Sequence, residues 1–90
     1  GQSAIMNITR SDGKNIPFAA DIYDEQGNVI GNVGQGGQAF VRGIEQQGNI
    51  SIKWLEESKP VSCLAHYQQS SEAEKIAQSI ILNGIRCQIQ

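Results

Sequence analysis

Two cysteines, Cys63 and Cys87, are the residues of this sequence with the clearest chemical potential. They lack the Cys-x-x-Cys spacing that is typical of zinc and thioredoxin-like sites. The sequence has 1 histidine, too few conventional ligands for a four-ligand metal site, so we expect no metal. A pair of reduced buried thiols and a disulfide both remain open, and the disulfide is favoured. It would stabilise the chain by roughly 3–4 kcal/mol and would indicate an oxidising compartment.

The remaining candidates for catalysis are His66 and two groups of carboxylates. The alternation around His66 places it on a strand surface beside Leu64. A disulfide would leave no cysteine nucleophile, and the sequence contains no Gly-x-Ser-x-Gly elbow. The carboxylates at 21–25 and 56–57 match no calcium-loop spacing and are typical of a solvated loop face. The sequence therefore predicts no catalytic residue and no enzyme.

A glycine-rich stretch at 34–39 fits the dinucleotide pattern Gly-x-Gly-x-x-Ala. That motif needs a helix that begins at the loop, because the helix N-terminus holds the pyrophosphate. Here the residues that follow, Phe40-Val41-Arg42, alternate like a strand. We interpret the stretch as a β-turn and expect no nucleotide and no cofactor.

Charge and hydropathy narrow the possible partners. The formal net charge is −2, and the 7 basic residues are scattered, so no basic stripe suited to nucleic acid is present. The longest apolar run, Ile80-Ile81-Leu82, is far shorter than the roughly 20 residues that cross a bilayer. The polar opening Gly1-Gln2-Ser3 shows no signal-peptide pattern, and we expect the sequence to be a segment of a longer protein.

The cysteines, the histidine and the carboxylates must be positioned by short alternating segments that are separated by glycine turns. This pattern is typical of an antiparallel sandwich or barrel. We predict a single domain over residues 1–90, mainly β, with an antiparallel β-sandwich of about seven strands of the immunoglobulin-like, Greek-key type. Both cysteines fall on rows that are predicted to face the core, as a buried disulfide requires. The expected strands lie at 4–9, 17–23, 29–33, 38–42, 50–54, 63–67 and 85–89.

Residues 72–82 allow two interpretations. Ser71 followed by Glu74 is a capping-box signal, and apolar residues then recur at helical spacing, which predicts one short helix. The alternative is a strand through 80–82 with Asn83-Gly84 as a hairpin turn. The helix is slightly favoured.

The motifs together resemble a known family. The sequence is similar to the C-terminal domain of fimbrial outer-membrane ushers of the chaperone–usher pathway, and most closely to that of P-pilus ushers. The resemblance covers nearly the whole chain, and Asn15 and Ala19 depart from residues that are common in the family. It rests on 13–22 (GKNIPFAADI), the glycines at 27 and 31, 33–43 (VGQGGQAFVRG), Trp54 and the two cysteines.

The resemblance implies a periplasmic domain of an outer-membrane protein in a Gram-negative bacterium. Its partners would be chaperone–pilin subunit complexes and the other domains of the same usher, with no cofactor and no nucleic acid. The usher would hold these complexes during pilus assembly and secretion, and we expect the isolated domain to be monomeric. The alternatives are an extracellular or periplasmic ligand- or carbohydrate-binding β-sandwich, and a module that only spaces other domains.

Some apolar residues alternate out of phase with the predicted core and are candidates for protein binding. Single exposed apolar residues are normal on any surface. A cluster of them would mark an interaction site. We predict that some of these residues form the docking surface: Ile5, Tyr23, Ile30, Phe40 and Leu64.

Overall fold

The computed structural model describes residues 2–90, which form eight strands and one short 3-10 turn. The N-terminal half contains β1 (Gln2–Arg10), β2 (Asp21–Tyr23), β3 (Val29–Val33), η1 (Gln35–Gly37) and β4 (Gln38–Ile44). The C-terminal half contains β5 (Gln47–Glu56), β6 (Lys59–Gln68), β7 (Lys75–Ile76) and β8 (Ser79–Ile89). Within this described part, no helix is long and apolar enough to cross a membrane.

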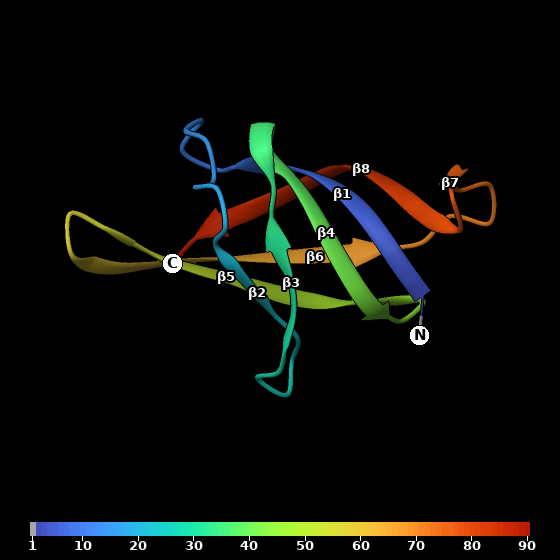
Figure 1. Ribbon diagram of the computed structural model, residues 1–90, viewed down its shortest axis with the longest axis horizontal. Coiled ribbons are helices and arrows are strands. Elements are labelled where there is room, and N and C mark those ends of the chain that lie inside the picture. Colours follow the sequence, from blue (N-terminus) through green and yellow to red (C-terminus); the bar gives the residue numbers. More distant parts are fainter. Residues whose placement is uncertain (1) are drawn as a thin grey trace.

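Seven of the strands in residues 2–90 close into a barrel, in the order β1-β4-β3-β2-β5-β6-β8, and β7 adds to β8 at the side. The barrel closes because β1 pairs with β4 in the antiparallel sense and with β8 in the parallel sense. Figure 1 shows β1 lying between these two strands. The prediction of a mainly β fold is confirmed, but the antiparallel sandwich is wrong. Inward and outward residues alternate alike in both architectures, so alternation cannot report the pairing that closes a barrel.

Side chains from the inward rows fill the barrel. The largest that are fully buried include Met6, Ile22, Ile50, Ile52 and Ile80. Each is flanked along its strand by residues that are more exposed, because successive side chains of a strand point to opposite faces. Burying one such side chain stabilises a fold by about 1.5–3 kcal/mol. The apolar interior is therefore the main source of stability.

The disulfide between Cys63 and Cys87 is confirmed. It joins β6 to β8, whose ladder runs from the pair Cys63–Ile89 to the pair Ala65–Cys87. Both cysteines are completely buried, as their inward rows predicted. The bond thus reinforces one of the two strand pairs, with β6 and with β1, through which β8 joins the rest of the barrel.

The helix predicted within 72–82 is wrong. Ala77 and Gln78 have φ values of 50° and 72° and form the two-residue turn between β7 and β8. Positive φ at both central residues is the geometry that joins antiparallel strands most tightly. Asn83-Gly84, the alternative hairpin turn, instead lies inside β8, where the register against β1 shifts. Long-range pairing with β1, which buries Ile80, overrides the local helical spacing.

The strand predicted from Pro17 also starts too early. Residues 17–20 form a turn in which the Ala20 amide donates to the Pro17 carbonyl at 3.2 Å, and β2 begins only at Asp21. Ala19 occupies the third position of this turn with φ 71°. Phe18 is consequently on the outside, 68% exposed, although strict alternation along the predicted strand 17–23 would give it the same face as the buried Ile22.

Candidate docking surface

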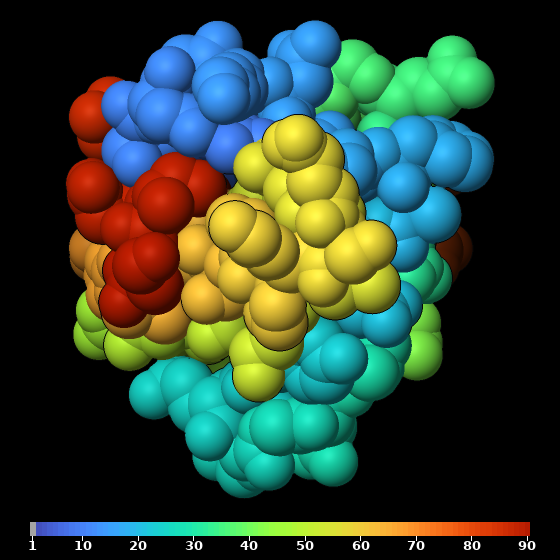
Figure 2. Space-filling view, turned by 90° about the vertical axis from the view of Figure 1, so that its left-hand side faces the viewer, coloured from blue at the N-terminus to red at the C-terminus, as the bar shows by residue number. Residues whose placement is uncertain are grey.

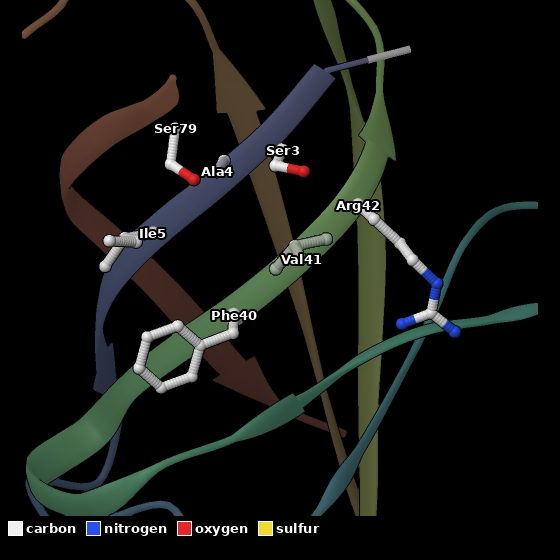
Figure 3. Close-up of a pocket in the computed structure, with 7 residues that line it drawn as sticks. All are labelled: Ser3, Ala4, Ile5, Phe40, Val41, Arg42 and Ser79. Carbon is white, nitrogen blue, oxygen red and sulfur yellow. The ribbon is translucent and has the colours of Figure 1, made fainter. Parts of the chain in front are cut away.

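A row of apolar side chains crosses the outside of the barrel over β8, β1 and β4. Ile5 on β1 lies directly opposite Phe40 on β4 and beside Ile81 on β8. Their strand neighbours Ala4, Val41 and Ile80 are buried in the core, so the row must face outward. Figure 3 shows Ile5 and Phe40 projecting to the same side of their strands.

The row continues past β3 to Phe18. Phe18 and Phe40 line one hollow, whose floor includes Gly31, Asn32 and Val33 of β3. Phe18 lies on the turn before β2 and is exposed. Phe40 lies on β4 and is 51% exposed. We call Ile5, Phe18, Phe40 and Ile81 the apolar face. Its members come from four separate segments, so only the folded barrel brings them together.

Polar groups surround the apolar face. Ser3, Ser79 and Arg42 line the hollow next to Ile5 and Phe40 (Figure 3). The Arg42 guanidinium donates to the Val29 carbonyl at 3.3 Å, and the Asn32 amide donates to Asp21 at 2.9 Å. An apolar centre within a polar rim is the usual organisation of a protein–protein interface.

The five predicted binding residues separate into two groups and one outlier. Ile5 and Phe40 lie side by side in the apolar face. Tyr23 and Leu64 lie on another side of the barrel, each opposite Ser51 of β5. Ile30 is partly buried against the core and belongs to neither group. Sequence reasoning missed Ile81, because the predicted helix hides its outward phase, and Phe18, because a strand over 17–23 gives it the same face as Ile22.

The group of Tyr23 and Leu64 differs from the apolar face because charges accompany it. The Lys53 ammonium lies 4.8 Å from the centroid of the Tyr23 ring. Asp24 and Glu25 line the same hollow as Tyr23 and Leu64. A sugar-binding platform needs an open aromatic face, and the ammonium covers one face of this ring. This group thus resembles an ordinary mixed surface more than a ligand site.

The residues considered for catalysis have structural roles or are exposed. His66 is exposed, with Nδ1 3.1 Å from Oδ1 of Asn49. The Asp24 carboxylate accepts hydrogen bonds from the Asn28 and Gln26 amides at 2.9 Å, which shapes the β2–β3 turn. The bond from the Asn28 amide is the main cause that lowers the pKa of Asp24. Across residues 2–90, no three His, Cys, Asp or Glu side chains gather as a metal site would require.

A buried arginine closes the end of the barrel near the C-terminus. Arg10 is 4% exposed and donates to Asp12 at 2.6 Å, to Glu56 at 2.8 Å and to the Asn15 carbonyl at 3.0 Å. Its guanidinium also lies 5.0 Å from the centroid of the Trp54 ring. Figure 2 shows this end, where the blue segment after β1 meets the yellow β5–β6 turn. Sequence reasoning missed this cluster, although Arg10 continues the inward row of Met6 and Ile8.

Charge pairing changes the pKa values in this cluster. Burial by itself lowers the pKa of Arg10, but the hydrogen bonds to Asp12 and Glu56 outweigh burial and raise it. The hydrogen bond from Arg10 lowers the pKa of Asp12. Hydrogen bonds from the Trp54 indole and from Arg10 lower the pKa of Glu56. The cluster is therefore fully ionised near neutral pH, and it holds the loop after β1 against β5.

Comparison with known proteins gives consistent matches. Residues 5–71 match the family model described as the PapC C-terminal domain. The chain is 98% identical over its full length to the outer membrane usher protein HtrE of Escherichia coli (strain K12), of which it covers 10%. It is 33% identical over 78 residues, 83% of its length, to the probable outer membrane usher protein LpfC' of Escherichia coli O157:H7, of which it covers 16%. The chain thus spans a small fraction of the curated relatives that it matches.

Two solved structures have the same fold. The C-terminal domain of the Caf1A usher has a TM-score of 0.75 at 23% identity, with 97% of each chain covered. Conserved hydrophobic clusters on the surface of that domain are important for F1 antigen assembly. The C-terminal domain of the PapC usher has a TM-score of 0.74 at 21% identity, covering 97% of this chain and 99% of its own.

Proposed function

The chain belongs to the PapC C-terminal domain family, and from this premise we propose that it is the part of an outer-membrane usher that binds chaperone–subunit complexes during pilus assembly. The proposal extends to the whole usher, of which this chain is a small part. In that role the domain holds a folded protein complex and carries out no chemistry of its own, with no cofactor.

The apolar face is the observation that carries the proposal. Phe18 and Phe40 are 68% and 51% exposed, and Ile5 and Ile81 extend the apolar surface across two further strands. Water makes such exposure unfavourable, by about 25 cal/mol for each Å² that a partner could cover. Contiguous exposed apolar surface on a folded domain usually marks a protein-binding site. The hydrophobic clusters that matter for assembly in the Caf1A domain support the same interpretation here.

The shape of the face favours a protein partner over a small ligand. A small ligand is usually enclosed by its pocket, which buries most of its surface. Here the side chains spread over β8, β1, β4 and the turn before β2, along the outer wall of the barrel. Such a spread suits the surface of a chaperone–subunit complex, with Phe40 near the centre of the contact.

The disulfide supports a periplasmic location for the domain. Structural disulfides persist in oxidising compartments, which include the bacterial periplasm. Chaperone–subunit complexes would meet the usher in this compartment, on the periplasmic side of the outer membrane. The isolated domain is expected to be monomeric and to contact other domains of the same usher within the full protein.

The test is binding of the 90-residue chain to a purified chaperone–pilin complex by isothermal titration calorimetry. Folding is first verified by circular dichroism, and the chaperone alone serves as a partner control. We expect saturable binding to the complex. Phe40→Ser should lower the affinity about 30-fold or more, because truncation of a central aromatic anchor costs about 2 kcal/mol or more.

Leu55→Ser is the matched control variant. Leu55 is 69% exposed, so its substitution removes a similar amount of exposed apolar surface outside the apolar face. Its affinity should equal that of the wild type. Equal losses in both variants would show non-specific adhesion, and absence of binding by a folded, oxidised wild-type chain would favour the spacer role.

A further inference from the structure

The ring of Phe40 lies against a glycine. A Cβ atom built on Gly34 would lie 2.6 Å from Cε2 and 3.4 Å from Cδ2 of the Phe40 ring, and 3.1 Å from the Gln38 carbonyl oxygen. Real side chains do not approach a Cβ as closely as 2.6 Å, so the ring occupies the space that a side chain at position 34 would need. Gly34 follows β3 directly, and its contact with Phe40 forms part of the hollow that Phe18 also lines.

The backbone at Gly34 does not itself require glycine. Its φ of −88° and ψ of −161° are extended values that any residue adopts. The Gly34 amide donates to the Gln38 carbonyl at 2.6 Å, as in an ordinary strand connection. Gly36 differs, because its φ of 70° favours glycine for conformational reasons. The Phe40 ring, at 2.6 Å, is thus the nearest obstacle to a side chain at position 34, ahead of the Gln38 carbonyl oxygen at 3.1 Å.

Gly31, which lies in β3, has to be glycine for a different reason than Gly34. A Cβ at Gly31 would lie 2.0 Å from the Phe40 carbonyl oxygen, which is backbone and cannot move aside. Gly31 therefore permits the close approach of β3 and β4. Its substitution would disturb the barrel, whereas a Cβ at Gly34 would meet the movable Phe40 ring at 2.6 Å and backbone, the Gln38 carbonyl oxygen, only at 3.1 Å.

An exposed aromatic side chain loses conformational freedom when a partner binds it. Fixing one such side chain costs about 0.5–1.5 kcal/mol of binding free energy. A ring that already packs against the flat backbone of a glycine has lost much of that freedom in the free protein. Preorganisation of this kind raises affinity without any new contact.

We propose that Gly34 is a positioning residue for docking: it provides the seat that holds the Phe40 ring against the barrel and facing the hollow shared with Phe18. This inference rests on the proposed function, since it concerns how the apolar face is prepared for its partner. Gly34 itself need not touch the partner. It acts through the orientation of Phe40, and its effect disappears when that ring is absent.

A double-mutant cycle tests the proposal. Gly34→Ala, Phe40→Ala and the double variant are titrated with the purified chaperone–pilin complex. Gly34→Ala should weaken binding about 3- to 10-fold, the loss that fixing one side chain implies. In the Phe40→Ala background the same substitution should change nothing, because interacting residues are not additive. Wild-type affinity for Gly34→Ala, or an equal loss in both backgrounds, would overturn the proposal.

Gly48→Ala is the matched control. A Cβ at Gly48 would lie 2.9 Å from the hydroxyl oxygen of Tyr67, so this variant also pushes a methyl group against an aromatic side chain. Tyr67 is buried in the core, away from the apolar face. The control should lower the melting temperature and leave the affinity unchanged. If Gly34→Ala is itself less stable, removal of the Phe40 ring in the double variant should relieve most of that strain and leave only the 3.1 Å contact with the Gln38 carbonyl oxygen.

Nuclear magnetic resonance examines the seat independently of binding. The wild-type chain should show nuclear Overhauser effects between the Gly34 α-protons and the Phe40 ring, and Gly34→Ala should lose them while β3 and β4 keep their cross-strand contacts. Absence of these effects in the wild type would show that no seat exists. A wild-type chain that fails to bind would overturn the proposed function. The nuclear Overhauser effects would then show, without any binding measurement, whether Gly34 holds the Phe40 ring in place.

Discussion

A buried charge and an exposed apolar face are the two regions that depart from the usual division of apolar inside and polar outside. Arg10 is buried, and its guanidinium is bonded to Asp12, Glu56 and the Asn15 carbonyl. No buried side-chain nitrogen or oxygen within residues 2–90 lacks a hydrogen-bond partner. Phe18 and Phe40, in contrast, leave half or more of their surface exposed. The charged groups of the first region find all their partners within the chain. The exposed apolar side chains of the second region are stabilised only when a partner covers them.

The comparison implies that changes inside the barrel lower stability, whereas changes on the apolar face alter binding. The disulfide should give the largest effect. Replacing Cys63 and Cys87 with alanine should destabilise the chain by about 3–4 kcal/mol, because the unfolded chain regains the entropy of an open loop. Urea unfolding followed by tryptophan fluorescence measures this loss. An unchanged transition midpoint would show that the barrel interior does not depend on the link between β6 and β8.

Arg10→Met should give the next largest effect. Methionine keeps an apolar stem in the buried position but loses the ionic hydrogen bonds and the contact with Trp54. We expect a loss of about 2–3 kcal/mol, since hydrogen bonds to charged groups contribute about 1.5–3 kcal/mol and a cation–π contact about 0.5–2 kcal/mol. Calorimetry of unfolding checks this value. Affinity for the chaperone–pilin complex should stay the same. A parallel loss of affinity would contradict the claim that the buried cluster affects stability alone.

The pH dependence of stability should show a smaller effect of the same cluster. The folded-state pKa values of Asp12 and Glu56 are lowered, so their contribution is present above the ordinary carboxylate range near pH 4. It is lost as the pH falls through the lowered values. The melting temperature of the wild type should therefore fall more steeply below about pH 4 than that of Arg10→Met. Parallel curves would show that Arg10 does not control these carboxylates.

Ala19→Gly should give the smallest effect, and it changes stability because it relieves backbone strain in the turn that carries Phe18. Ala19 holds a φ of 71° in the turn that exposes Phe18. A left-handed conformation costs an alanine about 1–2 kcal/mol. Part of the relief is offset by the extra freedom of glycine in the unfolded chain. We expect a net gain of about 0.5–1 kcal/mol in thermal unfolding. A loss of stability would show that the alanine methyl group makes contacts that outweigh the strain.

Several features of the structure could be predicted because they depend on local sequence. The inward rows of Ile50, Ile52 and Trp54, and of Cys63, Ala65 and Tyr67, follow from strict alternation and are buried as expected. The outward position of Phe40 between Ala39 and Val41 follows from the same rule. Asp24 and Gly27 also form one of the glycine turns that the pattern predicts between strands, in which the Gly27 amide donates to the Asp24 carbonyl at 3.1 Å.

Other features depend on contacts between residues far apart in the sequence. Alternation assigns each strand one inward face but does not choose its neighbours, so the parallel pairing of β1 with β8 was not foreseeable. The same pairing turned the expected helix within 72–82 into strand, because it buries Ile80 and places Ile81 beside Ile5.

The sequence by itself thus determined the β class, most of the inward rows and the resemblance to usher domains, and it favoured the disulfide. Only the tertiary structure decided that the sheet closes on itself and which exposed apolar residues share a face. It separated Tyr23 and Leu64 from Ile5 and Phe40, and it brought Phe18 and Ile81 to the latter pair. The physical reason is that the period of a strand fixes which side a residue faces, whereas its neighbours depend on pairing over long separations in the chain.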